Sequence, residues 1–364
     1  MTLEQSWHRV PGGTAVAALG MARALRAEGA TEIIGVSARH RAMAQDPWVP
    51  PVAVKQLPLP RAVLYESWHR FRKPRVQMAT GDVDVIHATT MAIPPRSAPL
   101  VVTIHDLAWL TAPDHFTRRG VRFFNKGLAL SLAEADLVLC PSEATRAACV
   151  RAGFAESRVR VAPLGIDLAE VTPEDVARVQ ARYSLHRPYI LWTGTIEPRK
   201  NLPGLLRAFT SLDSKCDLVL VGPKGWNEDI DTLITQALAT GGGKRTIRTL
   251  GFVDGNDLPA LYAGAEVFCF PSLLEGFGFP VLEAMAQGTA VVTSRGTSTE
   301  EIAGDAAVLV DPTDDESIRQ GLASALEDTE LRRRLATAGP TQAARFSWTN
   351  TARLLTDAYR EVAA

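Results

Sequence analysis

The sequence predicts an α/β protein with two domains, each built on a doubly wound parallel sheet. Short, continuously apolar segments alternate with longer amphipathic segments, which is typical of buried parallel strands joined by helices. The alternation runs separately through each half of the chain, which favours two Rossmann-like sheets. The length of 364 residues agrees with this division, because domains commonly hold roughly 100–200 residues.

The apolar segments give the expected strands in order. In the first half they lie at 32–37, 84–90, 100–106, 135–142 and 158–165; in the second half they lie at 188–194, 216–222, 246–253, 265–272, 290–294 and 307–312. The opening "MTLEQSW" is short for a first strand, which suggests that the amino end is clipped. The similar strings "ADLVLCPS" and "AEVFCFPS" lie 130 residues apart, and two similar halves would place them at equivalent strand ends.

A polar, proline-flanked segment at 169–187 separates the two series of strands. We therefore predict an N-terminal domain over 1–168, a linker over 169–187 and a C-terminal domain over 188–345. The last segment, 346–364, has the pattern of an amphipathic helix that begins after a Ser/Thr cap.

The composition excludes several classes of protein. With 46% hydrophobic residues, 22% charged residues and a net charge of −1, the chain is neither disordered nor dominated by nucleic-acid binding. Residues 1–168 carry 20 Lys and Arg against 14 Asp and Glu, whereas 169–364 carry 19 against 26, so the halves are expected to bind different partners. The sequence shows no signal peptide and no apolar run of the ~18–20 residues that a spanning helix needs, which predicts a cytoplasmic protein. The cysteines form no C-x-x-C pair and are expected to be reduced core residues: Cys140, Cys149, Cys216 and Cys269.

Two glutamates, Glu275 and Glu283, lie in "FPSLLEGFGFPVLEAMAQGTAVVTS" (270–294) after a buried strand. If 278–287 is helical, their eight-residue separation spans about 12 Å and turns them to different faces. Glycosidase carboxylates lie ~5 Å or ~6.5–9.5 Å apart, so this pair is better placed to hold opposite ends of an extended ligand. The backbone amides of 276–279 would open the helix and favour a phosphate between the two carboxylates. This arrangement fits a nucleotide sugar; a capped helix with one solvated glutamate is the alternative.

Three further segments carry candidate binding groups at the ends of expected strands. Arg199 and Lys200 follow the strand of "WTGTIEPRKNLPGLLRAF" and suit a diphosphate, although a solvated loop would have the same pattern. In "RVPGGTAVAALGMARAL" (9–25), two glycines including Gly13 precede a helix and would let amides approach an anion. His105 ends the strand of "TIHDLAWL", and His87 is a weaker candidate of the same kind; a structural histidine is the alternative for both.

With these motifs the sequence resembles a family 4 retaining glycosyltransferase of the GT-B fold over almost the whole chain. The resemblance is carried by "PGGTAVAALGMARAL", "TIHD", "VAPLGID", "TGTIEPRKNLPGLLRAF", "LGFVDGNDLPALYAGAEVFCFPSLLEGFGFPVLEAMAQGTAVVTS" and "GDAAVLVDP". It implies two Rossmann-like domains facing a central cleft, the first for the acceptor and the second for the nucleotide sugar. It also implies that the C-terminal helix 346–364 packs back on the N-terminal domain.

The resemblance also implies roles for individual residues. Glu275 and His105 would be the catalytic residues, the first binding hydroxyls of the donor sugar and the second lying beside sugar and acceptor. Glu283 would bind the ribose of the donor, and Arg199 and Lys200 would bind the leaving diphosphate. The backbone of Phe252 and Val253 would contact the base. The phosphates would be bound by the backbone amides of Gly276, Phe277, Gly278, Phe279 and Gly13. Many relatives carry an arginine where this chain has Thr195, so the diphosphate charge would rest more heavily on Arg199 and Lys200.

The resemblance implies transfer with retained configuration. Because no residue of these motifs is an evident nucleophile, the implied route is front-face attack. The departing phosphate oxygen would take the acceptor proton. No metal or other cofactor is expected, and the D-x-D letters at 82–84 are expected to be a loop. The motifs resemble bacterial mannosyl- and rhamnosyltransferases of polysaccharide assembly, which favours GDP-mannose as donor and leaves a UDP-sugar as the alternative.

The basic first half is expected to bind a glycolipid or oligosaccharide acceptor. The segment 61–75 places Leu64, Trp68 and Phe71 on one helical face among cations, and 116–128 repeats the mixture of aromatic and basic residues. Such helices can lie on an anionic membrane at its inner face, or pack their apolar stripe on their own domain.

Three other classes of protein remain as alternatives. A dinucleotide oxidoreductase is disfavoured because "GFGFPV" lacks the third glycine of the binding fingerprint. A nucleotide-sugar epimerase of the same fold would need no acceptor. A non-catalytic two-lobed sugar-binding protein would bind sugar without nucleotide.

Overall fold

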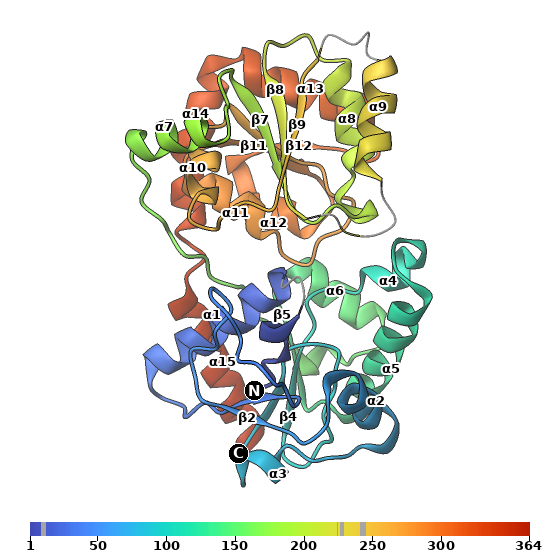
Figure 1. Cartoon of the computed structure of the whole chain (residues 1–364). Helices are drawn as coiled ribbons and strands as arrows, with labels where there is room; N and C mark the ends of the chain where they lie inside the picture. The colour runs from blue at the N-terminus through green and yellow to red at the C-terminus, as the bar shows by residue number, and fades with distance from the viewer. Residues whose placement is uncertain (9–11, 224, 226–228, 241–244) are drawn as a thin grey trace. The chain divides into compact units, whose positions relative to one another are not determined.

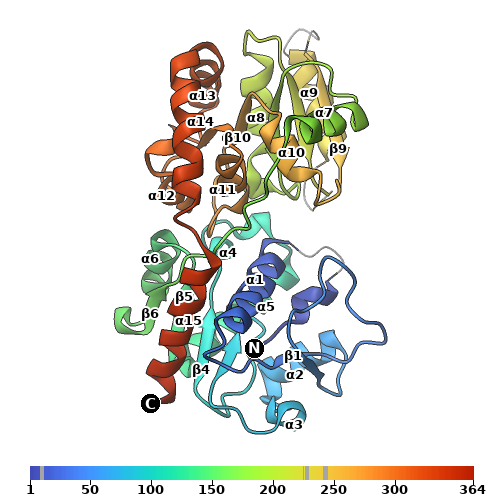
Figure 2. The ribbon, with the colours of Figure 1, turned by 90° about the vertical axis from the view of Figure 1, so that its left-hand side faces the viewer.

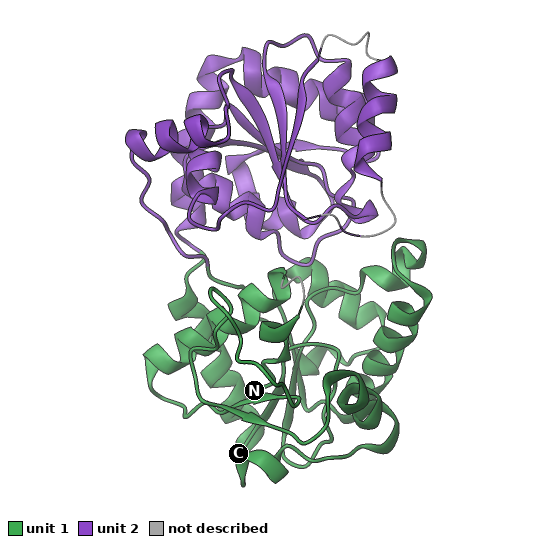
Figure 3. Cartoon of the chain, in the orientation of Figure 1, with its two compact units in different colours: residues 1–165, 346–364 green, residues 166–345 purple. Residues whose placement is uncertain are grey.

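The computed structural model describes residues 1–8, 12–223, 225, 229–240 and 245–364. They form two compact units (Figure 3), the first made of residues 1–165 and 346–364 and the second of 166–345. The predicted α/β class with parallel sheets is confirmed in both. The first unit ends at Gly165 rather than at 168, and the segment 169–187, expected to be a linker, belongs to the second unit.

The second unit is a six-stranded parallel sheet in the order β12-β11-β10-β7-β8-β9 (Figure 1). Its strands are β7 (Tyr189–Thr193), β8 (Asp217–Val221), β9 (Ile247–Gly251), β10 (Val267–Phe270), β11 (Ala290–Ser294) and β12 (Val308–Val310). Its helices are α7 (Pro173–Arg182), η4 (Pro198–Lys200), α8 (Leu202–Thr210), α9 (Ile230–Thr240), α10 (Leu258–Ala263), α11 (Phe279–Ala286), α12 (Ser298–Ala303), η5 (Gly304–Ala306), α13 (Asp315–Glu327) and α14 (Thr329–Ala343). Helices α9, α8 and α13 pack side by side in one layer, and α10, α11 and α14 pack in another.

Helix α7 occupies most of the expected linker and is anchored to α10. Thr172 and Asp175 form a capping box at its start. From its far end, Arg178 and Arg182 donate to the buried carboxylate of Asp257 at 2.9 and 2.7 Å. Two of the polar residues that suggested a linker thus hold the helix to the rest of the second unit.

The first unit contains a four-stranded parallel sheet, β3-β4-β5-β6, and a parallel pair, β1-β2. The strands are β1 (Gly35–Ser37), β2 (Val54–Gln56), β3 (Ile86–Ala88), β4 (Leu100–Thr103), β5 (Leu137–Cys140) and β6 (Val159–Val161). The helices are η1 (Glu4–Trp7), α1 (Gly13–Glu28), α2 (Arg61–Phe71), α3 (Gln77–Thr80), α4 (Ala108–Thr111), η2 (Pro113–His115), α5 (Arg118–Glu134), α6 (Glu143–Arg151), η3 (Glu156–Arg158) and α15 (Trp348–Ala363).

The first three residues connect the two parts of this sheet. The Thr2 amide donates to the carbonyl of His87 in β3, and the Leu3 amide donates to that of Val36 in β1, both at 2.9 Å. Segment 1–3 therefore fills the position of a central strand. The two similar strings do not occupy equivalent places in their sheets. The strand β10 pairs with β7, which is the first strand of its sheet in chain order, whereas β5 pairs with β4 and β6.

Helix α15 packs against α1 within the first unit (Figures 1 and 2), so the predicted return of the C-terminal helix is confirmed. Trp348 fits where Gly20 and Gly165 leave room, since a Cβ at either position would lie 2.2 Å from a Trp348 atom. The Tyr359 hydroxyl lies 2.7 Å from Nδ1 of His87, whose Nε2 lies 2.7 Å from Thr103 Oγ1. His87 is thus a buried structural residue, and burial lowers its pKa to about 3.

The aromatic segments of the first unit pack largely on their own domain. Leu64 and Trp68 are buried in its core, whereas Phe71 is 64% exposed. Phe123 and Phe124 are partly buried against the same core. The stripe that suggested membrane contact is therefore mainly a core contact, and no helix in the described parts of the chain is long and apolar enough to span a bilayer. The four cysteines are buried and free.

Candidate functional site

The carboxyl ends of β7 and β10 bring the principal candidate residues together. These strands are neighbours in the sheet of the second unit, so the loops that follow them start side by side. The first loop carries Arg199 and Lys200 in η4, and the second carries Glu275. The amide of Leu273 donates to the carbonyl of Arg199 at 2.8 Å, which ties one loop to the other. Ligands of open parallel sheets bind at this edge.

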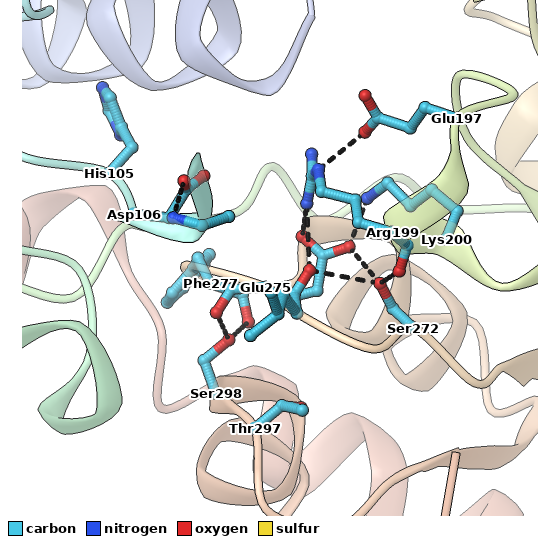
Figure 4. Close-up of polar contacts among 12 residues, drawn as sticks. His105, Asp106, Glu197, Arg199, Lys200, Ser272, Glu275, Phe277, Thr297 and Ser298 are labelled. Atoms are coloured by element: carbon cyan, nitrogen blue, oxygen red, sulfur yellow. Dashed lines mark hydrogen bonds and ion pairs between the residues drawn. The ribbon is translucent and has the colours of Figure 1, made fainter. Parts of the chain in front are cut away.

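Glu275 is the centre of a buried ion cluster (Figure 4). Its Oε2 accepts a hydrogen bond from Arg199 Nη1 at 2.8 Å, and its Oε1 accepts one from Lys200 Nζ. Arg199 also binds Glu197 through Nε, at 2.7 Å from Oε1. The side chains of Glu275 and Lys200 are only 8% and 9% exposed, and that of Arg199 is 19% exposed. Lys200 Nζ also lies 4.7 Å from the ring centre of Phe270.

The charges fix the protonation state of this cluster. Burial alone would raise the pKa of Glu275, but Arg199 and Lys200 outweigh it and lower that pKa to about 2. Burial lowers the pKa of Lys200, with Arg199 acting in the same direction and Glu275 opposing both. Glu275 is therefore a carboxylate at neutral pH. It can accept hydrogen bonds from hydroxyls but cannot serve as a general acid.

Two serines that the sequence reasoning missed hold the loop of Glu275 in place. Ser272 Oγ lies 2.9 Å from Glu275 Oε1 and 2.8 Å from the carbonyl of Arg199. Ser298 Oγ lies 2.9 Å from the carbonyls of both Glu275 and Phe277 (Figure 4). Ser272 belongs to the quoted "FPS" string, so its position after a buried strand was the available signal. Ser298 lies in α12, and no feature of the sequence pointed to it.

Glycine is required at the start of α11. Gly278 has φ 120°, and a Cβ there would lie 2.9 Å from Ile302 Cδ1 and 3.0 Å from Thr299 Cγ2. The close approach brings the backbone of 276–279 against α12. The predicted helix is present, and it starts at Phe279 with Gly278 as its N-cap.

Glu283 lies within α11 and does not join the ion cluster. Its Oε2 accepts a hydrogen bond from the Tyr262 hydroxyl at 2.9 Å, and that hydroxyl lies 2.7 Å from Thr193 Oγ1 at the end of β7. Burial raises the pKa of Glu283, and the hydrogen bond from Tyr262 partly offsets this. The two glutamates thus have different partners.

The other predicted donor contacts, Phe252, Val253 and Gly13, take no part in the ion cluster as the structure describes it. Phe252, after β9, is 74% exposed, whereas Val253 is buried. Gly13 is the exposed first residue of α1 in the other unit; residues 9–11 of its glycine segment lie outside the described residues.

His105 follows β4 in the first unit. Its Nε2 lies 3.0 Å from the carbonyl of Thr89, to which it donates. Burial lowers the pKa of His105, so the ring is neutral and Nδ1 is an acceptor at neutral pH. The next residue, Asp106, accepts a hydrogen bond from the Ala108 amide at 3.0 Å (Figure 4). Among the described residues no group of three or more His, Cys, Asp or Glu side chains is arranged to hold a metal ion.

Two glycosyltransferase family models match the chain, one in each unit. The family described as "Glycosyltransferase Family 4" matches residues 11–170, and that described as "Glycosyl transferases group 1" matches residues 175–342. The O-antigen chain mannosyltransferase B of Escherichia coli is 35% identical over 308 residues, which cover 82% of this chain and 80% of that protein. The serotype-specific mannosyltransferase WbdA of Escherichia coli is 31% identical over 283 residues, which cover 74% of this chain but 34% of that protein.

Solved structures share the arrangement of the chain. HepE of Anabaena, in complex with UDP and glucose, superposes with a TM-score of 0.77 at 21% identity, covering 97% of both chains. Sucrose-phosphate synthase of Thermosynechococcus elongatus superposes with a TM-score of 0.76 at 20% identity, covering 99% of this chain and 97% of that one. At these identities the likeness concerns the fold.

Proposed function

Because the chain belongs to family 4 of the glycosyltransferases and has their GT-B fold, we propose that it transfers mannose from GDP-mannose to a hydroxyl of a lipid-linked or oligosaccharide acceptor, with retained configuration. Glycosyl transfer itself follows from the family. The choice of mannose is supported by mannosyltransferases among the relatives, including the two described above. A UDP-sugar is the alternative donor.

The observation that carries the proposal is the cluster of Glu275, Arg199 and Lys200 at the carboxyl edge of the second unit. We assign donor binding to this unit and acceptor binding to the first. The cations would bind the diphosphate of the donor, and the carboxylate would accept hydrogen bonds from hydroxyls of its sugar. In the free protein Arg199 and Lys200 lower the pKa of Glu275 to about 2, so the group that meets the donor is a carboxylate.

In the proposed mechanism these residues stabilise charge rather than form a bond to the sugar. As the bond between the anomeric carbon and the phosphate breaks, negative charge grows on the diphosphate, and Arg199 and Lys200 would stabilise it. The acceptor hydroxyl attacks from the same face and gives its proton to the departing phosphate oxygen. Glu283, oriented by Tyr262, would bind the ribose of the nucleotide. His105, held by Thr89, would contribute its Nδ1 as an acceptor beside the sugar.

The first test is calorimetric titration of GDP, UDP and dTDP into the protein with EDTA present. Micromolar binding of GDP alone would support the GDP-mannose assignment and metal-independent donor binding; binding of UDP alone would replace it with a UDP-sugar. Binding of none of the three would contradict the donor site as assigned. The anomeric configuration of the product, read by NMR, tests retention, and turnover without any acceptor would favour an epimerase.

Cytoplasmic location and contact with an anionic membrane surface belong to the same proposal. Within 61–75 such contact would rest on the exposed Phe71 and on neighbouring cations, because Leu64 and Trp68 are buried. Binding to vesicles of anionic lipid that weakens with salt would support the contact. Absence of binding at low salt would favour a water-soluble acceptor.

A further inference from the structure

Asn201 joins the two cations of the ion cluster to helix α8. It follows Lys200 directly, caps the end of η4 and is the N-cap of α8. Its backbone is left-handed, with φ 55° and ψ 40°. In the described parts of the chain only three residues other than glycine have a positive φ: Arg72, Ser184 and Asn201. A Cβ makes this conformation unfavourable, but asparagine adopts it more readily than most residues, so the turn after Lys200 suits asparagine.

The side chain of Asn201 is held by the loop that follows β12. Its Nδ2 donates to the carbonyl of Pro312 at 2.6 Å. Gly204 in α8 leaves room for the amide, since a Cβ there would lie 2.7 Å from Asn201 Oδ1 and 2.8 Å from Nδ2. Asn201 is only 8% exposed, so little water is available to replace the hydrogen bond. The contact joins "TGTIEPRKNLPGLLRAF" to "GDAAVLVDP", two of the strings that carry the family resemblance.

Pro312 lies in a turn that has hydrogen bonds of its own. Asp311 Oδ1 accepts from the amide of Thr313 at 2.8 Å and from its hydroxyl at 2.6 Å. The Asp311 amide donates to Ser317 Oγ in α13 at 3.0 Å. The turn therefore has a defined conformation, and the Pro312 carbonyl is a fixed acceptor for the Asn201 amide.

The geometry of η4 decides where the cations lie. Arg199 and Lys200 are its last two residues, and both reach the carboxylate of Glu275 from this turn (Figure 4). A 3₁₀ turn of three residues does not keep its shape unaided, because it has few hydrogen bonds of its own. On one side the Arg199 carbonyl accepts a hydrogen bond from the Leu273 amide at 2.8 Å. At the end of η4 the anchor is Asn201.

We propose that Asn201 is a positioning residue that keeps Arg199 and Lys200 where the donor diphosphate binds. It does so through its left-handed turn and its hydrogen bond to Pro312. Cations that are already ordered bind an anion more tightly, because ordering them at the moment of binding costs free energy. The inference rests on the proposed function for the identity of the ligand. The hold of Asn201 on the cations is a property of the free protein and can be measured without nucleotide.

The first test measures, in the full-length free protein, whether Asn201 and Glu275 act together. Asn201→Gly keeps the left-handed backbone accessible and removes the amide that binds Pro312. Hydrogen exchange of peptides from β7 and β8 gives the protection factors of wild type, Asn201→Gly, Glu275→Gln and the double variant. Asn201 is not one of the groups that bind the Glu275 carboxylate, so the two effects should add unless Asn201 places the cations. We expect Glu275→Gln to lower protection at least about tenfold less in the Asn201→Gly background than in wild type.

Ser184→Gly is the matched control. Ser184 is also left-handed, with φ 53°, and lies in the same unit, but it is exposed and follows α7. Its effect should add to that of Glu275→Gln. Gly204→Ala is an independent variant, because alanine is the better helix former but its Cβ would displace the Asn201 amide, and it should show the same coupling as Asn201→Gly. Additive effects in Asn201→Gly, or in Gly204→Ala if the first variant does not fold, would overturn the proposal.

Calorimetry separates this inference from the proposed function. Asn201→Gly should weaken GDP and pyrophosphate binding at least about fivefold and leave guanosine binding within about twofold of wild type, because only the diphosphate meets the cations. An equal loss for all three ligands, or no loss for pyrophosphate, would contradict the positioning of the diphosphate site. If the coupling is present but wild-type protein binds neither GDP nor pyrophosphate, the donor assignment is refuted whereas the positioning of the cations stands. Additive effects with intact GDP binding refute only the positioning.

Discussion

Replacing Glu275 with glutamine removes a charge from the ion cluster while keeping the size of the side chain. Glutamine cannot balance Arg199 and Lys200, so two buried cations would be left with Glu197 as their principal counter-charge. We expect Glu275→Gln to abolish transfer, to leave GDP binding at least as tight as in wild type and to destabilise the second unit. The loss of stability follows from the pKa of Glu275.

The expected loss of folding stability is calculated from the fall of the Glu275 pKa from 4.5 to about 2. At about 1.4 kcal/mol for each pH unit, the charged carboxylate stabilises the folded unit by about 3 kcal/mol at neutral pH. Because the folded pKa lies below the unfolded one, this stabilisation is complete above about pH 5 and is lost as pH falls toward 2. The difference between wild type and variant should therefore be largest at pH 7 and shrink to about half by pH 3.

Hydrogen exchange measured by mass spectrometry on peptides from β7 and β8 reports the opening free energy of the second unit alone. Glu316→Gln is the matched control. The pKa of Glu316 is also lowered to about 2, by hydrogen bonds from Arg319 and Gln320, but the group is on the exposed surface of α13. Solvent screens such pairs, so its replacement should change stability little. If both variants are equally stable at pH 7, or if the effect of Glu275→Gln does not depend on pH, the reasoning about the buried cluster is wrong.

Three further substitutions test the remaining parts of the proposed donor site. Lys200→Ala should weaken GDP binding by about 1.5–3 kcal/mol, the range for a hydrogen bond to a charged group, and unchanged affinity in calorimetry would place Lys200 outside the site. Gly278→Ala should destabilise the second unit by about 1–3 kcal/mol and weaken GDP binding, because its φ of 120° and its close neighbours exclude a Cβ. The control is Gly296→Ala, where φ is 76° but nothing lies within 4 Å of the added Cβ; it should lower the stability measured by thermal unfolding less than Gly278→Ala does. Tyr262→Phe should weaken guanosine binding several-fold by freeing Glu283 while leaving pyrophosphate binding unchanged, and an equal loss for both ligands would argue against the ribose assignment.

Most of the strands could be predicted from the sequence because buried parallel strands are continuously apolar. Each predicted segment contains a strand, usually shorter than the apolar run. The strand that was missed, β2, reads Val-Lys-Gln and its last two side chains are exposed, so it has no apolar signal. Helix α7 was missed although Thr172, Pro173 and Asp175 carry a clear capping signal, because the polar composition suggested a linker.

Spacing and residue type could predict which loops of the second unit carry the candidate residues, but they could not predict the contacts between those residues. Arg199 and Glu275 were expected to bind different parts of a ligand, and the structure pairs them directly. A pattern of apolar positions likewise shows that Leu64 and Trp68 share a helical face, but it does not show what covers that face. Both questions depend on side-chain positions in three dimensions, which local sequence does not encode.

If the donor binds as proposed, the balance of charge in the cluster constrains its binding. Glu197 and Glu275 neutralise Arg199 and Lys200 in the free protein, so an incoming diphosphate would compete with carboxylates that already hold these cations. Through that competition the carboxylate of Glu275 would lose part of its ion pairing unless other hydrogen-bond donors replaced the cations. The hydroxyls of the transferred sugar can donate such hydrogen bonds, whereas a free nucleoside diphosphate has no hydroxyl at that position. The complete nucleotide sugar should therefore bind more tightly than the nucleoside diphosphate in wild-type protein, and this preference should disappear in Glu275→Gln, where no buried carboxylate remains to be satisfied. Calorimetry with GDP-mannose and GDP on both proteins measures it, and a preference that survives the substitution would mean that the sugar is held by other groups.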